Sequence, residues 1–311
     1  MKPRGQTKRW ASSLAAGGLV WAAWAFAAAG GEGSAGDPPP SLRVAISDLV
    51  AGEMNANDAA AALRAWSDAV ARQTGVRFAP ELCTTAQVVQ KVRNHQVDAL
   101  SVNILEFARV ASYTSRELVL DETQLPDGEE YVLLVHQSSG IQSLADLRGR
   151  SLLLYRNTRT CLDKIWLDSL LASERLGTAD TLLGRLETRP KLAHVVLPVF
   201  FRQADACLVT LRGYHTMCDL NPQLARQLRS LAVSPKLVTT FMAFHKDCPP
   251  ETKRRFLAAV ADLPKTIAGR QVLMLFGGTR LVQADVSVLR ASFEVLHAYE
   301  RLKGKTPAAG Q

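Results

Sequence analysis

The chain has 311 residues, of which 47% are hydrophobic, 6% aromatic and 21% charged, a balance typical of a globular protein rather than a disordered one. The formal net charge is +8, but Lys2, Arg4, Lys8 and Arg9 supply four of these charges, which leaves +4 for the rest. So mild a surplus, with no basic run interleaved with aromatic residues, gives no argument for a nucleic-acid partner and suits either a small anionic ligand or simple solubility.

Residues 1–29 have the pattern of a secretory signal peptide. A basic start precedes an uncharged apolar stretch that ends in Ala27-x-Ala29. The uncharged run is also long enough to cross a membrane, so a retained anchor is the alternative. Its high content of Ala and Gly favours cleavage near Ala29 and export to the periplasm. Residues 30–40, rich in Gly and Pro, then predict a flexible exit segment.

Strands and helices alternate in the next part of the chain. Residues 41–47, 76–82 and 97–102 are β-rich runs, and the helical patterns of residues 57–75 and 85–96 lie between them. Such alternation predicts a mainly parallel sheet that is covered by helices.

After residue 103 the rhythm changes, and a second α/β unit is indicated from about residue 134 to residue 235. The predicted strands or extended runs that follow residue 103 are 117–124, 129–137, 151–155, 193–199, 204–210 and 236–247. A helix is predicted over 161–175, and from 248 the chain is predicted to be helical almost to its end, with Pro249 and Pro250 suited to a helix start.

The C-terminal helices are expected to return to the first unit. This gives lobe I as residues 41–133 plus 236–311 and lobe II as residues 134–235, joined by two chain crossings that form a hinge.

Several motifs, in this order, resemble a known family. The phrase S-L-x-D-L-x-G occupies residues 143–149, the pair Asp205-Ala206 lies in a late strand, and the helix at 248–263 follows the second crossing. Together they resemble the periplasmic phosphate/phosphite/phosphonate-binding (PhnD-like) proteins of ABC importers. The resemblance implies an α/β, two-lobed type II periplasmic binding protein fold. Each lobe would be a mainly parallel sheet flanked by helices, with a two-strand hinge, a ligand in the cleft and an ABC permease as partner.

The helix start of that family typically reads Ser-Thr-Ser-Gly followed by an aromatic residue. Here Asn157, Thr158, Arg159, Thr160 and Cys161 occupy the place, so the hydroxyls are kept, Arg159 is inserted and the glycine is lost. This departure leaves the identity of the ligand open.

Physical chemistry also favours an anion at this helix start. Unpaired backbone N–H groups carry partial positive charge there, the hydroxyls of Thr158 and Thr160 can donate, and Arg159 or Arg156 can add a bidentate contact. The alternative is that Thr160 only caps the helix and forms a capping box with Asp163. Both roles are compatible, since Thr158 can bind while Thr160 caps.

Further ligand contacts are predicted after the strands. Ser47 and Asn103 follow the first and third strands of lobe I, where open sheets bind ligands. Their alternative is ordinary turn or N-cap duty. Tyr155 ends a strand and either lines the cleft or is buried. His215 follows a strand and either contacts the anion or is a solvated loop residue.

Among the functions considered, an enzyme is the least favoured by the sequence. Cys161 at a helix start is a candidate nucleophile, but the sequence contains no G-x-S-x-G, H-E-x-x-H or P-loop motif, and His215-x-x-Cys218 offers too few zinc ligands. We therefore predict a monomeric binding protein for a phosphonate, phosphate or phosphite, without enzymatic activity, metal or cofactor. A ligand sensor that partners a membrane sensor kinase or cyclase is the alternative, ahead of a cysteine-dependent enzyme.

The number of cysteines matters because an exported chain can form disulfides in an oxidising compartment. There are five: Cys83, Cys161, Cys207, Cys218 and Cys248. An odd number leaves at least one free or paired to another chain, and Cys207–Cys218 is the bridge to test first.

Overall fold

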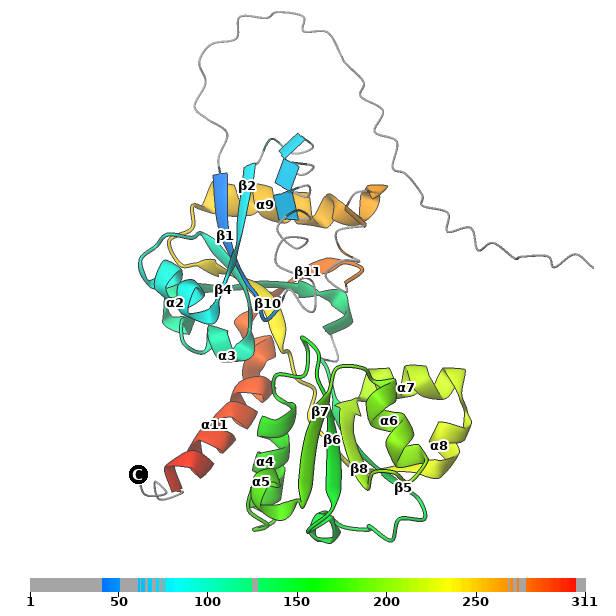
Figure 1. Ribbon diagram of the computed structural model, residues 1–311. Helices are drawn as coiled ribbons and strands as arrows, with labels where there is room; N and C mark the ends of the chain where they lie inside the picture. Colours follow the sequence, from blue (N-terminus) through cyan, green and yellow to red (C-terminus); the bar gives the residue numbers. More distant parts are fainter. Residues whose placement is uncertain are drawn as a thin grey trace, which may run out of the picture. The chain divides into compact units, whose positions relative to one another are not determined.

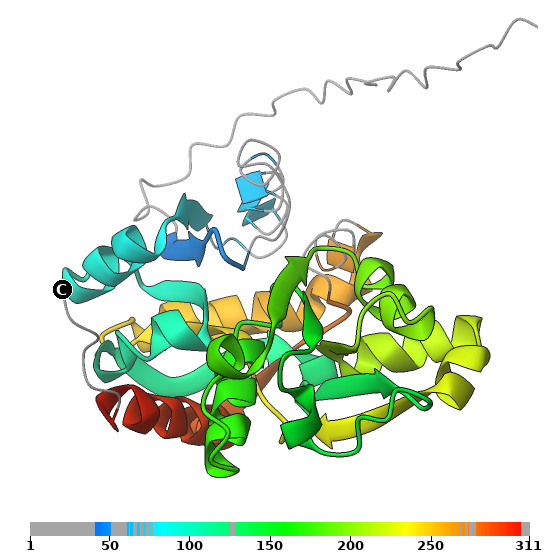
Figure 2. The ribbon, with the colours of Figure 1, turned by 60° about the horizontal axis from the view of Figure 1, so that its bottom comes forward.

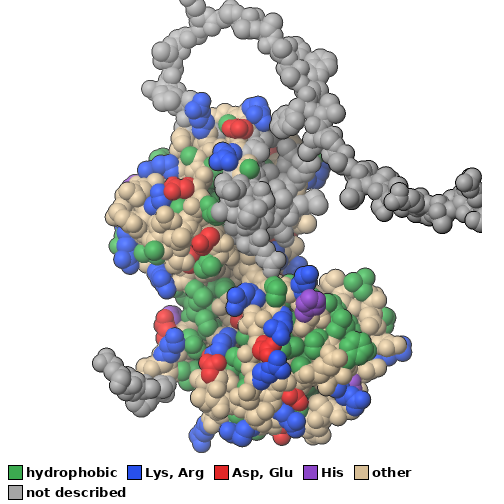
Figure 3. Space-filling view, viewed as in Figure 1, with side chains coloured by type: hydrophobic (Ala, Val, Ile, Leu, Met, Phe, Trp, Pro, Cys, Tyr) green, Lys and Arg blue, Asp and Glu red, His purple; other side chains and the backbone are tan. Residues whose placement is uncertain are grey.

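The residues that the computed structural model describes are 41–50, 77–124, 128–267, 269–270, 273 and 278–305, with 61, 63–64, 67–68, 71–72 and 75 between the first two stretches. The predicted signal peptide and exit segment therefore lie outside the described residues. No helix within these residues combines the length and apolarity that a membrane span requires. On the face seen in Figure 3, Lys and Arg side chains are interspersed with Asp and Glu.

A first sheet has the strand order β11-β4-β10-β3-β1-β2 (Figure 1). Its strands are β1 Ser41–Ser47, β2 Arg77–Cys83, β3 Ala99–Asn103, β4 Thr114–Asp121, β10 Thr240–His245 and β11 Leu281–Asp285. β1 pairs in parallel with both β2 and β3, whereas β10 is antiparallel to β3 and β4, and β11 is antiparallel to β4. The strands predicted for lobe I from 41 to 102 are confirmed within one or two residues.

A second sheet has the order β7-β6-β8-β5-β9. Its strands are β5 Tyr131–His136, β6 Ser151–Tyr155, β7 Arg185–Arg189, β8 Ala206–Thr210 and β9 Leu228–Val233. β6 pairs in parallel with β7 and β8, but β5 is antiparallel to β8 and β9. Both sheets are thus mixed rather than mainly parallel. The reason is that β5 and β10 enter their sheets directly from the chain crossings, without the crossover that a parallel neighbour requires.

Helices flank both sheets. The α-helices are α2 Thr85–Arg93, α3 Ile104–Phe107, α4 Asp163–Ser173, α5 Ala179–Leu182, α6 Ala193–Phe200, α7 Leu211–Leu220, α8 Gln223–Gln227, α9 Pro250–Asp262 and α11 Arg290–Lys305. The short 3-10 helices are η1 Ala111–Tyr113, η2 Glu122–Gln124, η3 Leu144–Leu147, η4 Leu263–Lys265 and η5 Val286–Leu289. Figure 1 shows α4 and α5 on one side of the second sheet and α6, α7 and α8 on the other.

Several predictions of secondary structure are wrong. The apolar run 193–199, predicted as a strand, is helix α6, whose Val195, Val196 and Val199 are fully buried. A short apolar run does not distinguish a buried strand from a buried helix. The sheet position goes instead to β7, an edge strand with the charged sequence RLETR. β11 likewise interrupts the C-terminal stretch that was predicted to be helical.

Within the described part, the chain passes between the sheets twice, from β4 to β5 and from β9 to β10. The two crossings are joined by backbone pairing, because Glu129 N donates to Leu237 O (2.7 Å) and Leu237 N to Glu129 O (2.9 Å). The lobe ranges remain a prediction, but all of β5, from Tyr131, pairs in the second sheet.

The C-terminal helix contacts elements of both sheets. Figures 1 and 2 both show α11 beside α4, against which it packs. The Phe293 ring of α11 lies 6.3 Å from the Phe107 ring of α3, which follows β3. The Ser292 hydroxyl accepts a hydrogen bond from Val238 N (3.0 Å) and donates to Val238 O (2.8 Å), in the second crossing. Helix α11 therefore ties the two sheets and the crossing together.

Candidate functional site

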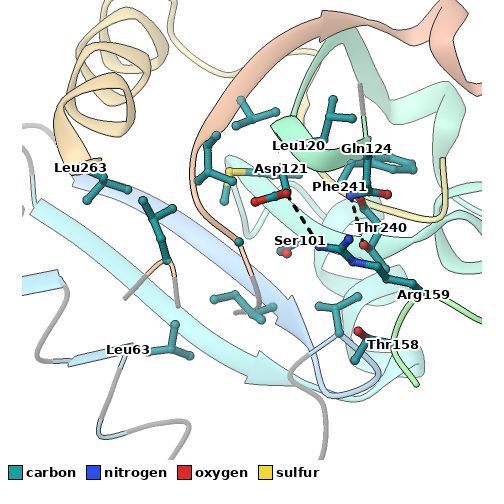
Figure 4. A pocket seen from close by; sticks show the side chains of 17 residues that line it. Leu63, Ser101, Leu120, Asp121, Gln124, Thr158, Arg159, Thr240, Phe241 and Leu263 are labelled. Carbon is teal, nitrogen blue, oxygen red and sulfur yellow. Dashed lines mark hydrogen bonds and ion pairs between the residues drawn. The ribbon is translucent and has the colours of Figure 1, made fainter. Parts of the chain in front are cut away.

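A cavity of about 140 Å³ is lined by segments that belong to different sheets. The turn between β6 and α4, in the second-sheet part, contributes Thr158 and Arg159. Among the described residues, the first sheet and the crossing contribute the remaining polar lining: Ser101, Asp121, Gln124 and Thr240. Figure 4 shows these polar side chains together at one end of the cavity.

Arg159 reaches from its turn to the first crossing. Its Nη1 donates to the Thr123 hydroxyl at 3.0 Å, and it forms ion pairs with Asp121 Oδ1 and Glu129 Oε2, each at 3.8 Å. Glu129 is only 3% exposed, and this burial raises the pKa of its carboxyl, an effect that the nearby Arg159 and Arg212 oppose. The guanidinium thus links the second-sheet part to the crossing and places a cation between two carboxylates at the cavity wall.

The backbone of this turn is held by neighbouring polar groups. The Tyr131 hydroxyl, on the fully buried β5 side chain, donates to Arg159 O at 2.7 Å. Asn157 Oδ1 accepts from Arg159 N (2.7 Å), and Thr160 Oγ1 accepts from Asn157 N (2.9 Å). Such local side-chain bonds compete with helix formation and fix the turn instead.

Helix α4 consequently begins later than predicted, at Asp163, with Leu162 in the N-cap position and no side-chain cap. The predicted capping box of Thr160 and Asp163 is wrong because the Thr160 hydroxyl is used within the turn. Burial raises the pKa of Asp163 to about 6. Thr158 and Arg159 therefore precede the helix, and any ligand contact they make comes from their side chains and the turn rather than from the first helical amides.

The predicted stretch is divided between two cavities. Thr158 and Arg159 line the cavity described above. Asn157 and Thr160 instead line a second one, of about 280 Å³, together with Arg156. Only two of the four residues predicted at this helix start are thus brought together with residues of the first sheet.

The side chains of Ser47 and Asn103 form hydrogen bonds within the first-sheet part of the protein. The Ser47 hydroxyl donates to Glu106 Oε1 at 2.7 Å, as does the Thr85 hydroxyl at 2.6 Å. Asn103 is the N-cap of α3, where its Oδ1 accepts from Glu106 N (3.0 Å) and Glu106 Oε2 accepts from Asn103 N (3.2 Å). Both residues are buried, and neither lines the cavity. Ser101, two residues earlier in β3, does.

Tyr155 and His215 also lie away from the cavity lining. Tyr155 is partly buried at the end of β6 and packs against the apolar cluster of the second sheet. His215 is exposed on α7, which begins directly after β8 where a loop was predicted. Arg212, in the first turn of α7, donates to the Thr123 carbonyl at the first crossing.

Sequence reasoning missed Asp121, Gln124 and Thr240. Asp121 accepts from the backbone amides of Thr123 (2.9 Å) and Thr279 (3.0 Å), and Gln124 Nε2 donates to Thr240 O at 2.8 Å. All three flank the chain crossings. Their position in the chain could have indicated them, because residues next to the segments that join two lobes face the space between those lobes.

All five cysteines lie among the described residues, and all are free thiols, so the Cys207–Cys218 bridge, the candidate pairing to test first, is not formed. Burial raises the pKa of the Cys161 thiol to about 12. A reactive cysteine needs the opposite shift, towards the thiolate. Cys161 is therefore not an activated nucleophile.

One group of described residues has potential metal ligands within 4.8 Å of one another: His95, His245 and Asp247. The two imidazoles are stacked, with centroids 4.2 Å apart and planes inclined by 13°. Lone pairs in nearly parallel planes do not converge on one ion. His245 Nδ1 also accepts a hydrogen bond from the backbone amide of Asp247 at 3.2 Å. The contacts of this group therefore stabilise the local structure.

The comparisons with known proteins identify the family. The family model described as "ABC transporter, phosphonate, periplasmic substrate-binding protein" matches residues 50–289. A search of curated proteins finds no match.

Solved structures agree in fold. A binding protein component of an ABC phosphonate transporter from Pseudomonas aeruginosa has 15% identity and a TM-score of 0.55, with 88% of this chain and 91% of that chain covered. PhnD1 from Prochlorococcus marinus, solved with methylphosphonate, has 12% identity and a TM-score of 0.56, with 85% and 99% covered. A Xanthomonas citri protein bound to ATP has 17% identity and a TM-score of 0.54, with 85% and 98% covered. The chain has the two-lobed α/β periplasmic binding protein fold and belongs to the non-enzymatic family of periplasmic substrate-binding proteins of phosphonate ABC transporters.

Proposed function

We propose that this protein captures a small oxyanion, a phosphonate, phosphate or phosphite, in the cavity between its two sheets and delivers it to an ABC permease. The observation that carries the proposal is the composition of the cavity wall, in which Thr158 and Arg159 from one part face Ser101 and Thr240 from the other. Family membership supports the transport role.

The polar wall offers donors that match an oxyanion. The Thr158 hydroxyl and the Arg159 guanidinium can donate from the second-sheet part, and charge-assisted bonds to an anion are the stronger kind. The hydroxyls of Ser101 and Thr240 complete the opposite wall. Asp121 also lies at this end, but two backbone amides of its own part and Arg159 compensate its charge.

Closure follows from this division of the contacts. A ligand shifts a conformational equilibrium only by its difference in affinity for the two states. An oxyanion that touches both walls binds the closed state more tightly than an open one, where only one wall is within reach. The described parts of the two crossings, residues 122–124, 128–130 and 234–239, are the hinge that we propose for this movement.

We further propose that residues 1–29 are a signal peptide cleaved near Ala29, and that the mature protein works in the periplasm as a monomer. The basic start and apolar stretch support export.

Calorimetric titration of the protein with methylphosphonate, phosphite, phosphate, methanesulfonate and an amino acid tests the ligand class. We expect the phosphorus oxyanions to bind and the amino acid not to bind. Ligand that binds the native state alone also raises the melting temperature by mass action, which provides an independent readout. Binding of the amino acid without binding of any phosphorus oxyanion would overturn the proposal.

A further inference from the structure

A buried carboxylate lies at the edge of the first sheet. Glu106, in the four-residue helix α3, is only 2% exposed. Its Oε1 accepts hydrogen bonds from the hydroxyls of Ser47 (2.7 Å) and Thr85 (2.6 Å), and its Oε2 accepts one from Asn103 N (3.2 Å). Three donors from three segments of the chain therefore converge on the two oxygens of one anion.

These contacts exceed what a helix cap requires. The capping box of α3 needs only the pair of Asn103 and Glu106, three residues apart. The two hydroxyls come from elsewhere, because Ser47 ends β1, 59 residues before Glu106, and Thr85 begins α2, 21 residues before it. The Ser47 oxygen accepts from Leu49 N (3.1 Å), so its own proton is directed to the carboxylate. Tertiary structure thus assembles the donors around Glu106.

The donors lie where open α/β sheets bind ligands. β1 and β3 are parallel neighbours, so Ser47 and Asn103 lie at the carboxyl ends of adjacent strands, and ligands of such sheets sit beyond those ends. Ser47 and Asn103 are buried, whereas Thr85 is partly exposed, so the donors extend from the interior to the surface. A carboxylate is itself a small oxyanion, and hydrogen bonds to a charged acceptor are the stronger kind.

We infer that Ser47, Thr85 and Asn103 form a site for a small carboxylate anion, and that the chain fills this site with its own Glu106. The side chain thereby withholds the three donors from solute anions. The inference does not depend on the proposed function, because none of these residues lines the cavity of Arg159.

Replacing Glu106 with Ala opens the site to solutes. The atoms removed are a methylene and a carboxylate, which together have the size and charge of acetate. Three hydrogen bonds to a charged acceptor are lost, so we expect the melting temperature of Glu106→Ala to fall by about 5 °C or more. Acetate that binds only the native state should raise it again, by about 3 °C at ten times the acetate dissociation constant.

Matched controls separate binding from a general effect of the salt. Wild-type protein in the same acetate solutions measures the general effect, which is subtracted. Acetamide has the shape of acetate without its charge and should not stabilise Glu106→Ala. Glu106→Gln also removes the charge but leaves the space filled, so this variant should be destabilised without responding to acetate.

A second substitution locates the bound acetate. Thr85 is partly exposed, and its hydroxyl is one of the three donors. Adding Thr85→Val to Glu106→Ala should weaken acetate binding at least about tenfold, the loss expected for one hydrogen bond to a charged group.

The outcomes decide between a filled anion site and an ordinary helix cap. A saturable stabilisation by acetate in Glu106→Ala, absent from Glu106→Gln and weakened by Thr85→Val, supports the inference. The same response in all variants and the wild type, or no response in Glu106→Ala, refutes it. If Glu106→Ala is unfolded in buffer, circular dichroism follows the same titration: recovery of the helical signal supports the inference, and its absence refutes it. Methylphosphonate enters none of these measurements, so the proposed function is tested separately.

Discussion

Replacing Arg159 with Ala removes the guanidinium from the polar end of the cavity. Its side chain is 19% exposed and contacts Thr123, Asp121 and Glu129 from across the crossing. The truncation therefore deletes both a donor that can reach the ligand and the positive charge that offsets two buried carboxylates.

The magnitude follows from these contacts. A hydrogen bond to a charged group contributes about 1.5–3 kcal/mol, which corresponds to a loss of about 10- to 150-fold in affinity. Asp121 and Glu129, each 3.8 Å from the guanidinium, then act on the anion without that cation, which changes affinity in the same direction. We therefore expect methylphosphonate to bind at least tenfold more weakly to Arg159→Ala.

Calorimetric titration of the variant with methylphosphonate measures the loss. Arg156→Ala is the matched control, because Arg156 is exposed in the same stretch but lines the other cavity. It should retain affinity within about twofold, well under the tenfold that one charged contact implies. The reasoning is refuted if Arg159→Ala changes affinity by less than about threefold, or if both variants lose it equally.

Further predictions concern the same turn. Thr158→Val should weaken methylphosphonate binding about two- to tenfold in calorimetry, whereas Thr160→Val should mainly lower the melting temperature, since the Thr160 hydroxyl holds the turn; equal affinity losses would contradict this. Burial raises the pKa of Asp163 from 3.8 to about 6, so the stability that its protonation contributes is fully present below pH 3.8 and is lost as pH rises through about 6. Asp163→Asn should therefore raise the melting temperature by a few degrees at pH 7.5 and not at pH 4; a gain independent of pH would show that ionisation is not the cause. Cys161, whose pKa is raised to about 12, should resist iodoacetamide at pH 8 in the folded protein and react once it is unfolded, as read by mass spectrometry; rapid native labelling would contradict its burial.

Much of the fold was predictable because local signals agreed with the tertiary structure. The β-rich runs at β1 and β2 and the helical pattern that gives α2 are readable from sequence. Pro250 likewise marks the start of α9. Helix α6 was not predictable in this way, because its valine-rich sequence has strand propensity and only packing against the second sheet makes it helical.

The site was only partly predictable for a related reason. Thr158 and Arg159 stand out locally, as hydroxyl and charge before an amphipathic helix. Ser101 and Thr240 become lining residues only when β3 and β10 pair, which is a contact across more than a hundred residues of sequence. Ser47 follows a strand as a ligand-binding residue would, but its hydroxyl donates to the buried Glu106 carboxylate instead. No local sequence pattern indicates that partner.

The most direct test of the account is a crystal structure of the protein with methylphosphonate. The account predicts phosphonate oxygens within hydrogen-bond distance of Thr158 and Arg159 on one side and of Ser101 or Thr240 on the other. A phosphonate bound in the second cavity, beside Asn157, or in contact with only one of the two sheets, would contradict it.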